Sequence, residues 1–205
     1  MTLYSRYILP KLVHVACSRE PHRRRREALV PQARGRVLEI GIGSGLNLPY
    51  YDAGRVTRLW GLEPSPELTR MAEKAARSVD FDVEFIGLPG EEIPLEDDSV
   101  DTVLMTYTLC TIRDTGPALR QMARVLRPGG ELLFCEHGAA PELSVRRWQD
   151  RMDPIWKRLG GGCRLNRAIP DLIRQGGFRI RQINSMYLPG WRPASFNYWG
   201  SATHE

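Results

Sequence analysis

The chain has 205 residues, which is enough for one domain with a full-sized core and too few for two independent domains. Hydrophobic residues make up 42% and charged residues 26%, as is ordinary for a globular protein, and no stretch approaches the ~20 consecutive apolar residues of a membrane-spanning helix. The apolar start, residues 7–17, is interrupted by Pro10, Lys11 and His14, and no small-residue cleavage site follows. We therefore expect one cytoplasmic domain over residues 1–205.

The net charge of +5 is unevenly spread, because four consecutive arginines follow His22 at residues 23–26. Such a run is typical either of a patch for anionic lipid or nucleic acid, or of a solvated helix face. No aromatic residues interleave with these arginines. We therefore expect no nucleic-acid partner and leave open peripheral contact with an anionic membrane.

The cysteines and histidines show no metal-ligand spacing. The four cysteines are widely separated, without a C-x-x-C pair, which argues against a zinc site, and a cytosolic location argues against disulfides. Cys110 and Cys135 have apolar neighbours, as small buried hydrophobic residues do. The sequence thus predicts no metal site among its cysteines and histidines, which are Cys17, Cys110, Cys135, Cys163, His14, His22, His137 and His204.

Short β-type runs alternate with helical runs along the chain, which predicts a parallel sheet covered by helices on both faces. Strands are expected at residues 36–40, 58–62, 83–86, 100–105, 131–136, 178–185 and 194–200. Helices are expected at residues 66–76, after Ser65 as N-cap, at 117–126, before the breaker Arg127-Pro128-Gly129-Gly130, and at 166–175. With the last two strands as an antiparallel edge pair, this is a doubly wound α/β fold with a mostly parallel seven-stranded sheet and an antiparallel last strand.

Two segments lie outside this alternation. Residues 3–30 precede the first strand and are expected to form one or two helices, an N-terminal helical arm (residues 1–30). Residues 141–165 follow the fifth strand, carry Trp148 and Trp156, and include a Gly160-Gly161-Gly162 hinge. A long insertion at the carboxyl end of a strand is more often a functional lid than an idle loop. We expect a lid here, with both tryptophans as its packing.

A glycine-rich loop, E-I-G-I-G-S-G-L-N at residues 39–47, follows the first strand and is expected to open a helix. A doubly wound sheet binds ligands at the carboxyl ends of its strands, and glycine lets the backbone approach a ligand closely. A dinucleotide fingerprint has a small residue at the end of G-x-G-x-x-G, where this chain has Leu46. The loop therefore disfavours a dehydrogenase.

Two acidic residues indicate the ligand. Glu39 stands before the first glycine, where its carboxylate would repel a pyrophosphate but suits the ammonium and sulfonium groups of S-adenosylmethionine (SAM). Glu63 ends the second strand, about 20 residues on, where an acidic side chain accepts both ribose hydroxyls. Each acid alone also fits a helix cap or a solvated carboxylate. Together with the glycines they predict SAM as the cofactor.

Two later segments complete the expected site. Gly90 and Glu91 follow the third strand, beside the expected adenine. The fourth strand ends at Thr106-Tyr107-Thr108-Leu109-Cys110, where cofactor and substrate should meet. Both segments are expected at the same carboxyl edge of the sheet as the glycine loop.

Several motifs resemble known families. EIGIGSG, GLEPS, GEEIPLEDDSVD and VLRPGGELLF, within residues 36–136, resemble the class I SAM-dependent methyltransferases, which include the quinone C-methyltransferases. A narrower resemblance spans nearly the whole chain. TYTLCTI, EHGAA, WQDRMDPIW and GGGCRLNR are similar to the methyltransferase-like thiol S-methyltransferases of the endoplasmic reticulum and their bacterial relatives.

The resemblance implies methyl transfer from SAM to a small thiol or sulfide, with an acceptor pocket near Asp153, Trp156 and Cys163. The animal members begin with a hydrophobic membrane anchor, where residues 3–30 of this chain are shorter and more basic, and Pro89 replaces a polar residue beside the adenine. The predicted cofactor residues are Glu39, Gly41, Gly43, Ser44, Gly45, Asn47, Glu63, Pro64, Gly90, Glu91, Thr106 and Leu109.

Methyl transfer from a sulfonium is an in-line displacement that neutralises charge, so the protein's work is to align the reacting atoms and exclude water. A thiol with a pKa of about 8.5 is already partly ionised near neutral pH, whereas an amine or phenol depends more on a base. His137, at the end of strand five, is the candidate base, or alternatively a hydrogen-bonded structural histidine. Asp153 is the candidate for orienting the acceptor, or alternatively caps a turn.

Other functions stay open. The acceptor is alternatively a quinone, a phospholipid amine or another small metabolite. The second alternative is a non-enzymatic SAM-binding module that uses the basic arm. The sequence determines neither the acceptor nor the oligomeric state.

The arm and the lid are both expected near the carboxyl ends of the strands, above the methyl donor, where they would act as a closing device. Triple glycine lowers the cost of the large dihedral changes that closure requires. Tyr4, Tyr7 and Leu12 are expected to supply the apolar roof of an acceptor pocket. Residues 23–26 are expected to stay in solvent or to touch an anionic surface.

Overall fold

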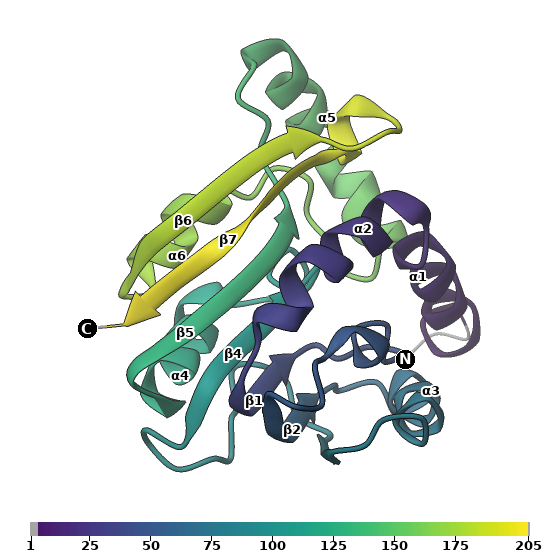
Figure 1. Cartoon of the computed structure of the whole chain (residues 1–205). Coiled ribbons are helices and arrows are strands. Elements are labelled where there is room, and N and C mark those ends of the chain that lie inside the picture. Colours follow the sequence, from purple (N-terminus) through teal and green to yellow (C-terminus); the bar gives the residue numbers. More distant parts are fainter. Residues whose placement is uncertain (1–3, 205) are drawn as a thin grey trace.

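Seven strands form one sheet in the order β3-β2-β1-β4-β5-β7-β6 in the computed structural model, which describes residues 4–204 (Figure 1). Strands β1 to β5 run parallel, and β7 lies antiparallel between β5 and β6. The mostly parallel sheet with an antiparallel last strand is thereby confirmed. The strands are β1 (Gly35–Ile40), β2 (Val56–Leu62), β3 (Asp82–Ile86), β4 (Val100–Thr106), β5 (Leu126–His137), β6 (Phe178–Tyr187) and β7 (Phe196–His204).

The expected helices form close to their predicted bounds. Ser65 caps α3 by accepting a hydrogen bond from the Leu68 N–H at 3.4 Å, as the sequence predicts. The last helix, α6, begins later than expected, because Pro170 occupies its first turn, where proline is tolerated. The helices are α1 (Leu9–Cys17), α2 (Glu20–Leu29), α3 (Pro66–Ala76), α4 (Thr115–Val125), α5 (Leu143–Leu159) and α6 (Ile169–Gln175), with short turns η1 (Tyr4–Ile8), η2 (Val30–Gln32), η3 (Leu48–Tyr50) and η4 (Arg192–Ala194).

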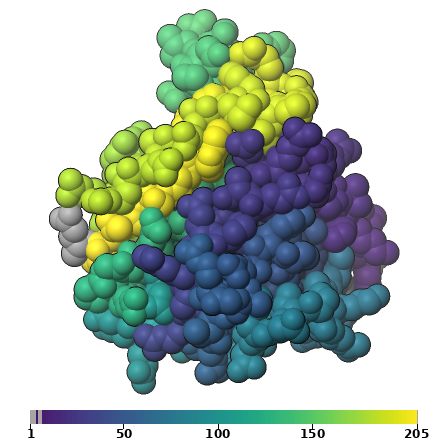
Figure 2. All heavy atoms as spheres, viewed as in Figure 1, coloured from purple at the N-terminus to yellow at the C-terminus, as the bar shows by residue number. Residues whose placement is uncertain are grey.

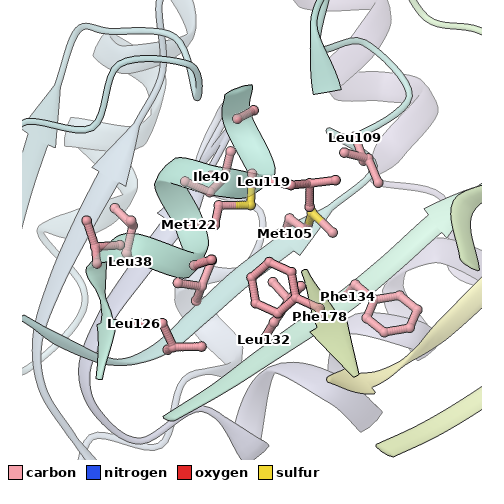
Figure 3. Packing of buried hydrophobic residues seen from close by; sticks show 14 of the residues in the cluster. Leu38, Ile40, Met105, Leu109, Leu119, Met122, Leu126, Leu132, Phe134 and Phe178 are labelled. Atoms are coloured by element: carbon pink, nitrogen blue, oxygen red, sulfur yellow. The ribbon is translucent and has the colours of Figure 1, made fainter. Parts of the chain in front are cut away.

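Successive residues of the central strands pack into two hydrophobic clusters, one on each face of the sheet. On β5, Leu132 and Phe134 belong to the cluster with α4 and α6 (Figure 3), whereas Leu133 and Cys135 belong to the cluster with α2 and α3. Side chains alternate between faces along a strand, so a parallel sheet that is apolar at every position must be covered on both sides. Helices cover both faces, as expected.

The glycine loop departs from the prediction, because it does not open an α-helix. After Asn47 only the short turn η3 (Leu48–Tyr50) forms before β2. The side chains of Asn47 and Tyr51 both donate to the Glu39 carboxylate at 2.7 Å. In addition, Pro49 has no N–H to donate in the hydrogen bonds of an α-helix. These contacts hold the chain against the end of β1 instead of letting it extend into a helix.

Strand β5 begins earlier than expected, and the breaker sequence lies inside its bounds. Its pairing with β4 is interrupted there: Val100 opposes Leu126, whereas the next partner, Thr102, opposes Glu131. The intervening residues bulge, with Gly129 at a φ of +77°. The regular ladder from Glu131 onward corresponds to the strand that the sequence predicts.

Two segments that are far apart in the sequence lie at the carboxyl edge of the sheet. The arm folds as η1, α1 and α2, and in Figure 2 its purple surface lies between the yellow C-terminal strands and the blue residues that follow β1. Most of the expected lid is a helix, α5, followed by a loop in which Gly161 and Gly162 have φ values of +63° and +99°. Among the helices of residues 4–204, none combines the length and the apolar character that a membrane crossing requires.

Candidate functional site

A cavity of about 680 Å³ opens at the carboxyl ends of β1, β2 and β4. The glycine loop, the arm, the residues after β3 and the loop after α5 all contribute to its wall. Most of the predicted cofactor residues line this cavity, namely Glu39, Gly41, Gly43, Ser44, Asn47, Glu63, Pro64, Gly90, Glu91 and Thr106.

Two predicted cofactor residues do not line the cavity. Gly45 has a φ of +78° and packs on α3, where a Cβ atom would lie 2.8 Å from Leu48 Cδ1 and 3.1 Å from Ala72 Cα. Its glycine identity therefore serves close packing of the loop. Leu109 is fully buried, and its N–H donates to Glu136 Oε1 at 2.9 Å.

The Glu39 carboxylate forms the polar floor of the cavity and is only 1% exposed. Oε1 accepts from Asn47 Nδ2 and Oε2 from the Tyr51 hydroxyl, each at 2.7 Å. Burial raises the pKa of Glu39 to about 7, although both hydrogen bonds favour the ionised form. Asn47 also donates to Thr106 Oγ1 at 3.0 Å, while its own Oδ1 is buried without a hydrogen-bond partner. Glu39 and this free oxygen together suit a small cationic donor such as an ammonium group.

The Glu63 carboxylate joins the glycine loop to the start of α3. Oε2 accepts from the Gly43 N–H at 3.1 Å, and Oε1 accepts from the Ser65 N–H at 2.9 Å. Burial raises the pKa of Glu63, which these backbone donors oppose. Each carboxylate oxygen still has a lone pair for a further donor, so Glu63 can accept from two neighbouring hydroxyls.

The end of β4 is held in an unusual conformation beside the glycine loop. Tyr107 has a φ of +58°, which is uncommon for a residue with a side chain and clusters at functional sites. Its N–H donates to the Cys135 carbonyl at 2.8 Å. The next residue, Thr108, lies so close to Gly41 that a Cβ atom there would be 2.4 Å from Thr108 Oγ1. A glycine is therefore required where the two loops meet.

Glu136, which the sequence reasoning missed, fixes the loop after β4. Its fully buried carboxylate accepts from the N–H groups of Thr108, Leu109 and Cys110 at 2.8, 2.9 and 3.4 Å. Burial raises the pKa of Glu136 to about 7 against these donors. Arg167 donates to the carbonyls of the same loop, at Leu109 and Ile112. An acid inside the apolar run ELLFCE was the available signal, since a buried carboxylate needs partners.

One face of the arm's first helix forms part of the cavity wall. The residues that line it are Leu9, Pro10, Val13, His14 and Cys17, a spacing that places them on one side of an α-helix. His14 Nδ1 also lies 2.7 Å from Ser44 Oγ, which ties the arm to the glycine loop. This helical periodicity was readable in the sequence.

The expected roof residues of the arm lie elsewhere. Tyr7 and Leu12 are 54% and 52% exposed, and the Tyr4 hydroxyl donates to the Leu159 carbonyl at 2.7 Å. None of the three lines the cavity, so this prediction was wrong. The reason is geometric: successive helical residues are turned by about 100°, so Leu12 lies to the side of the face whose middle is formed by Val13, Cys17 and Pro10.

The basic run is not wholly solvated either. Arg26 is only 5% exposed and lines the cavity, where its guanidinium donates to the Cys17 carbonyl at 2.6 Å and lies 5.3 Å from the Tyr107 ring centre. The Arg25 guanidinium lies 4.6 Å from the Trp199 ring centre. Only Arg23 and Arg24 point to solvent and pair with Glu20. The helical repeat turns successive arginines to different faces, which the run of letters conceals.

Neither predicted catalytic residue lines the cavity. Asp153 Oδ1 accepts from the Leu165 N–H at 2.8 Å, which fits the alternative that this residue caps a turn. His137 Nε2 lies 3.2 Å from Cys163 Sγ. Both residues therefore contact the segment that follows α5.

His137 and Cys163 belong to a sulfur cluster behind the cavity wall. Cys163 Sγ lies 3.8 Å from Cys110 Sγ and 3.3 Å from Trp156 Nε1. A hydrogen bond from Cys110 and the charge of His137 lower the pKa of Cys163 well below its usual range. Although burial favours the neutral imidazole, the adjacent Cys163 raises the pKa of His137. The sequence spacing gave no sign of this cluster.

The lid meets the arm at the rim of the cavity. Gly160 and Gly161 both line it, and a Cβ atom on Gly161 would lie 2.7 Å from Leu9 Cδ2. Because Gly161 also has a φ of +63°, a side chain there would be strained and would displace the end of the Leu9 side chain. The start of α1 and the loop after α5 are thus in close contact at this rim.

Proteins similar in sequence to this chain are methyltransferases. A family described as "Methyltransferase domain" matches residues 38–134. The human protein Thiol S-methyltransferase TMT1B is 34% identical over 178 residues, which is 83% of this chain and 72% of that protein. Phosphatidylethanolamine N-methyltransferase of Cereibacter sphaeroides is 33% identical over 122 residues, 58% of this chain and 59% of that protein. A solved SAM-dependent methyltransferase from Methanosarcina mazei shares the fold, with a TM-score of 0.64 and 24% identity over 83% of this chain and 93% of that one.

Proposed function

The chain belongs to the class I SAM-dependent methyltransferases, and on that premise we propose that it methylates the sulfur of a small, lipophilic thiol or sulfide. The relative that supports this choice, a thiol S-methyltransferase, aligns with most of the chain. The cavity supports it as well, because Leu9, Pro10 and Val13 give its arm-side wall an apolar patch next to His14 and Arg26.

The proposed cofactor contacts rest on one observation above all. Asn47 Oδ1 is buried without a partner beside the Glu39 carboxylate, and the SAM ammonium group supplies the donors that this pair lacks. Glu63 is proposed to accept from the ribose hydroxyls, and Gly90 and Glu91 to contact the adenine. Once bound there, SAM supplies an electrophilic methyl group.

The chain's own contribution to the reaction is alignment and exclusion of water. The loop after β4 is fixed by Glu136 and Arg167, and the arm covers the cavity through Val13 and His14. A thiolate that attacks a sulfonium loses charge on the way to products, so a dry, apolar wall favours the transition state. A thiol ionises readily, so this function does not depend on His137 as a base within the cavity.

The experiment is a panel of acceptors with labelled SAM and the full-length protein. We expect label in S-methyl products of small lipophilic thiols. Glu63→Ala, which removes a proposed cofactor contact, serves as the low-activity control on the same panel at a SAM concentration below that variant's dissociation constant. Turnover confined to amines would favour the phospholipid amine alternative, turnover confined to quinones the quinone alternative, and SAM binding without any turnover a non-enzymatic module.

We also propose cytoplasmic residence with peripheral contact to anionic membrane through the arm. The outer face of the arm exposes large apolar side chains beside basic ones, namely Tyr7, Ile8, Leu12, Val15 and Lys11. An amphipathic basic helix of this kind lies in a lipid interface. Co-sedimentation with anionic vesicles, but not with neutral ones, is the expected result, and no sedimentation with either would contradict it.

A further inference from the structure

Three ligand-type side chains converge from separate parts of the fold. Cys110 lies in the loop after β4, His137 is the last residue of β5, and Cys163 lies in the loop after α5. The two sulfurs and one imidazole nitrogen all lie within 4.8 Å of one another. Cys110 and His137 are buried and Cys163 is partly buried, so the group is sheltered from solvent without being sealed.

The two measured separations in this group are close to the edges of a zinc tetrahedron. Zinc binds thiolate sulfur at about 2.3 Å and imidazole nitrogen at about 2.0–2.1 Å, so two such ligands are about 3.8 Å apart for S and S and about 3.6 Å for S and N. The observed separations are 3.8 Å between Cys110 Sγ and Cys163 Sγ, and 3.2 Å between Cys163 Sγ and His137 Nε2. The second has to lengthen by a few tenths of an ångström, and the third separation, between Cys110 Sγ and the His137 imidazole, lies within 4.8 Å and has to settle at about 3.6 Å when the ion binds.

We propose that Cys110, His137 and Cys163 form a zinc site whose fourth position takes the sulfur of the acceptor, a refinement that rests on the proposed thiol methylation. Two thiolates and an imidazole are a donor set that selects zinc over the oxygen-preferring cations magnesium and calcium. Three protein ligands with one exchangeable position are typical of catalytic zinc sites.

The ligands are held in place by the surrounding backbone. The Arg164 N–H donates to the Cys110 carbonyl at 3.0 Å, and the Cys163 N–H donates to the Gly160 carbonyl at 3.2 Å. Glu136 accepts from the Cys110 N–H, so its carboxylate is committed to the loop and does not compete for the ion. Because the ligands are already positioned before the ion binds, less conformational entropy is lost on binding.

The site adjoins the methyl-transfer cavity through its own ligand loops. Thr111 follows Cys110 and lines the cavity, and Gly160 lines it while contacting Cys163. None of the three ligands lines the cavity itself, so the loop at Gly160 has to shift for the fourth position to open into it. The acceptor sulfur would bind zinc as a thiolate, with its proton leaving as hydronium on the displaced water.

The methyl transfer is then a single in-line displacement. The thiolate sulfur forms a bond to the methyl carbon while the bond from that carbon to the sulfonium sulfur breaks, and the electron pair stays on the cofactor's sulfur. The products are a thioether and S-adenosylhomocysteine. A neutral thioether is a weaker zinc ligand than a thiolate, so the product leaves and water returns.

Metal content is the first test. The full-length protein, purified without an affinity tag after growth with zinc, should carry one zinc per chain by plasma mass spectrometry. Cys163→Ala and His137→Ala should each lower zinc affinity on the order of 100-fold or more in a chelator competition, since a ligand costs at least what its supporting contacts do. The matched control is Cys135→Ala, which removes a buried cysteine that lies outside the cluster.

SAM binding measured on every variant reports whether the variant has folded. A folded wild-type protein without stoichiometric zinc, even after reconstitution with zinc, would overturn the site. Zinc retained equally by the Cys163 and Cys135 variants would overturn it as well.

Cobalt substitution tests the fourth position without turnover. Adding a thiol acceptor to the cobalt protein should strengthen the sulfur-to-cobalt charge-transfer absorption, and adding an amine of similar shape should not. Thiol methylation at full rate by zinc-free protein would overturn the role of the ion while leaving the proposed function intact. Stoichiometric zinc without thiol methylation would do the reverse, supporting the site and refuting the function.

Discussion

The two sides of the cavity are built by different physical means. The proposed cofactor side consists of carboxylates and glycine backbone at the ends of β1 and β2, and it is held by hydrogen bonds, some local, as from Asn47 to Glu39, and some between strand ends, as from Gly43 to Glu63. The arm and lid side combines apolar residues with His14 and Arg26 and is assembled from distant segments, as where Leu9 meets Gly161. The proposed cofactor side is thus built from polar hydrogen bonds, whereas the proposed acceptor side depends on the packing of distant segments.

Removing the arm should separate the two sides most clearly. Deletion of residues 1–20 takes away the wall at Val13 and His14 but leaves Glu39 and Glu63 in place. Turnover should fall by roughly 100-fold or more, because alignment and water exclusion are lost, while calorimetry should show SAM affinity within about tenfold of wild type. Leu12→Ala, on the exposed face, is the control. A truncated protein that folds, binds SAM and methylates at full rate would show that the arm is only packing.

The cofactor side should respond to a single carboxylate. Glu63→Ala removes an acceptor of two hydroxyl donors and should weaken SAM binding by roughly 1.5–3 kcal/mol, the range for charge-assisted hydrogen bonds. Calorimetry or the SAM-dependent rise in melting temperature measures the change. Glu73→Ala, an exposed acid on α3, is the matched control. Equal affinities for the two variants would remove Glu63 from the cofactor site, and binding of NAD in place of SAM would refute the cofactor altogether.

The acidity of Glu39 should make cofactor affinity depend on pH. Burial raises the pKa of Glu39 to about 7, and only the ionised carboxylate attracts a cationic ligand. SAM affinity should therefore rise with pH up to about 7 and then level off, by at most roughly tenfold per pH unit. Calorimetry across this range should show a flatter profile for Glu39→Gln, since the titration of SAM itself is common to both proteins. Parallel profiles would contradict the assignment.

The stability of the cofactor-free protein should fall as pH rises, whereas its SAM affinity should increase. Burial favours the protonated form of Glu39, so the pKa of this carboxyl in the folded protein lies above its ordinary value of 4.5. The stabilisation that the protonated carboxyl gives to the folded state is therefore fully present below pH 4.5 and is lost as pH rises through about 7. The cofactor-free protein should lose free energy of unfolding over this interval, and Glu39→Gln should lose less. Denaturant titrations at several pH values measure both.

The smallest expected effect concerns the lid loop. Gly161→Ala introduces a Cβ at a positive φ and against Leu9, at a cost of roughly 1 kcal/mol or more. Turnover should fall several-fold with SAM affinity unchanged, because the strained loop closes less well over the acceptor. Gly116→Ala, in the first turn of α4, is the control. A fall in SAM affinity instead would place the loop on the cofactor side.

Local pattern was sufficient for much of the fold. Apolar runs bounded by glycine and proline predicted the central strands, and Ser65 predicted the start of α3, because caps and breakers act within a few residues. The same reasoning failed after the glycine loop. There Tyr51 bonds back to Glu39 and prevents the helix that an open loop would allow.

The sequence by itself determined that Glu39 and Glu63, the proposed cofactor residues, lie close together, since they follow strands whose ends must meet in a parallel sheet. Only the tertiary structure decided which residues gather beside the proposed acceptor position. Cys163 lies 26 residues from His137 and 53 from Cys110, so no spacing rule links the three, and the widely spaced cysteines argued against a zinc site. Parallel strands bring their carboxyl ends to one edge whatever the length of the connections, and that edge is where sulfur and imidazole converge.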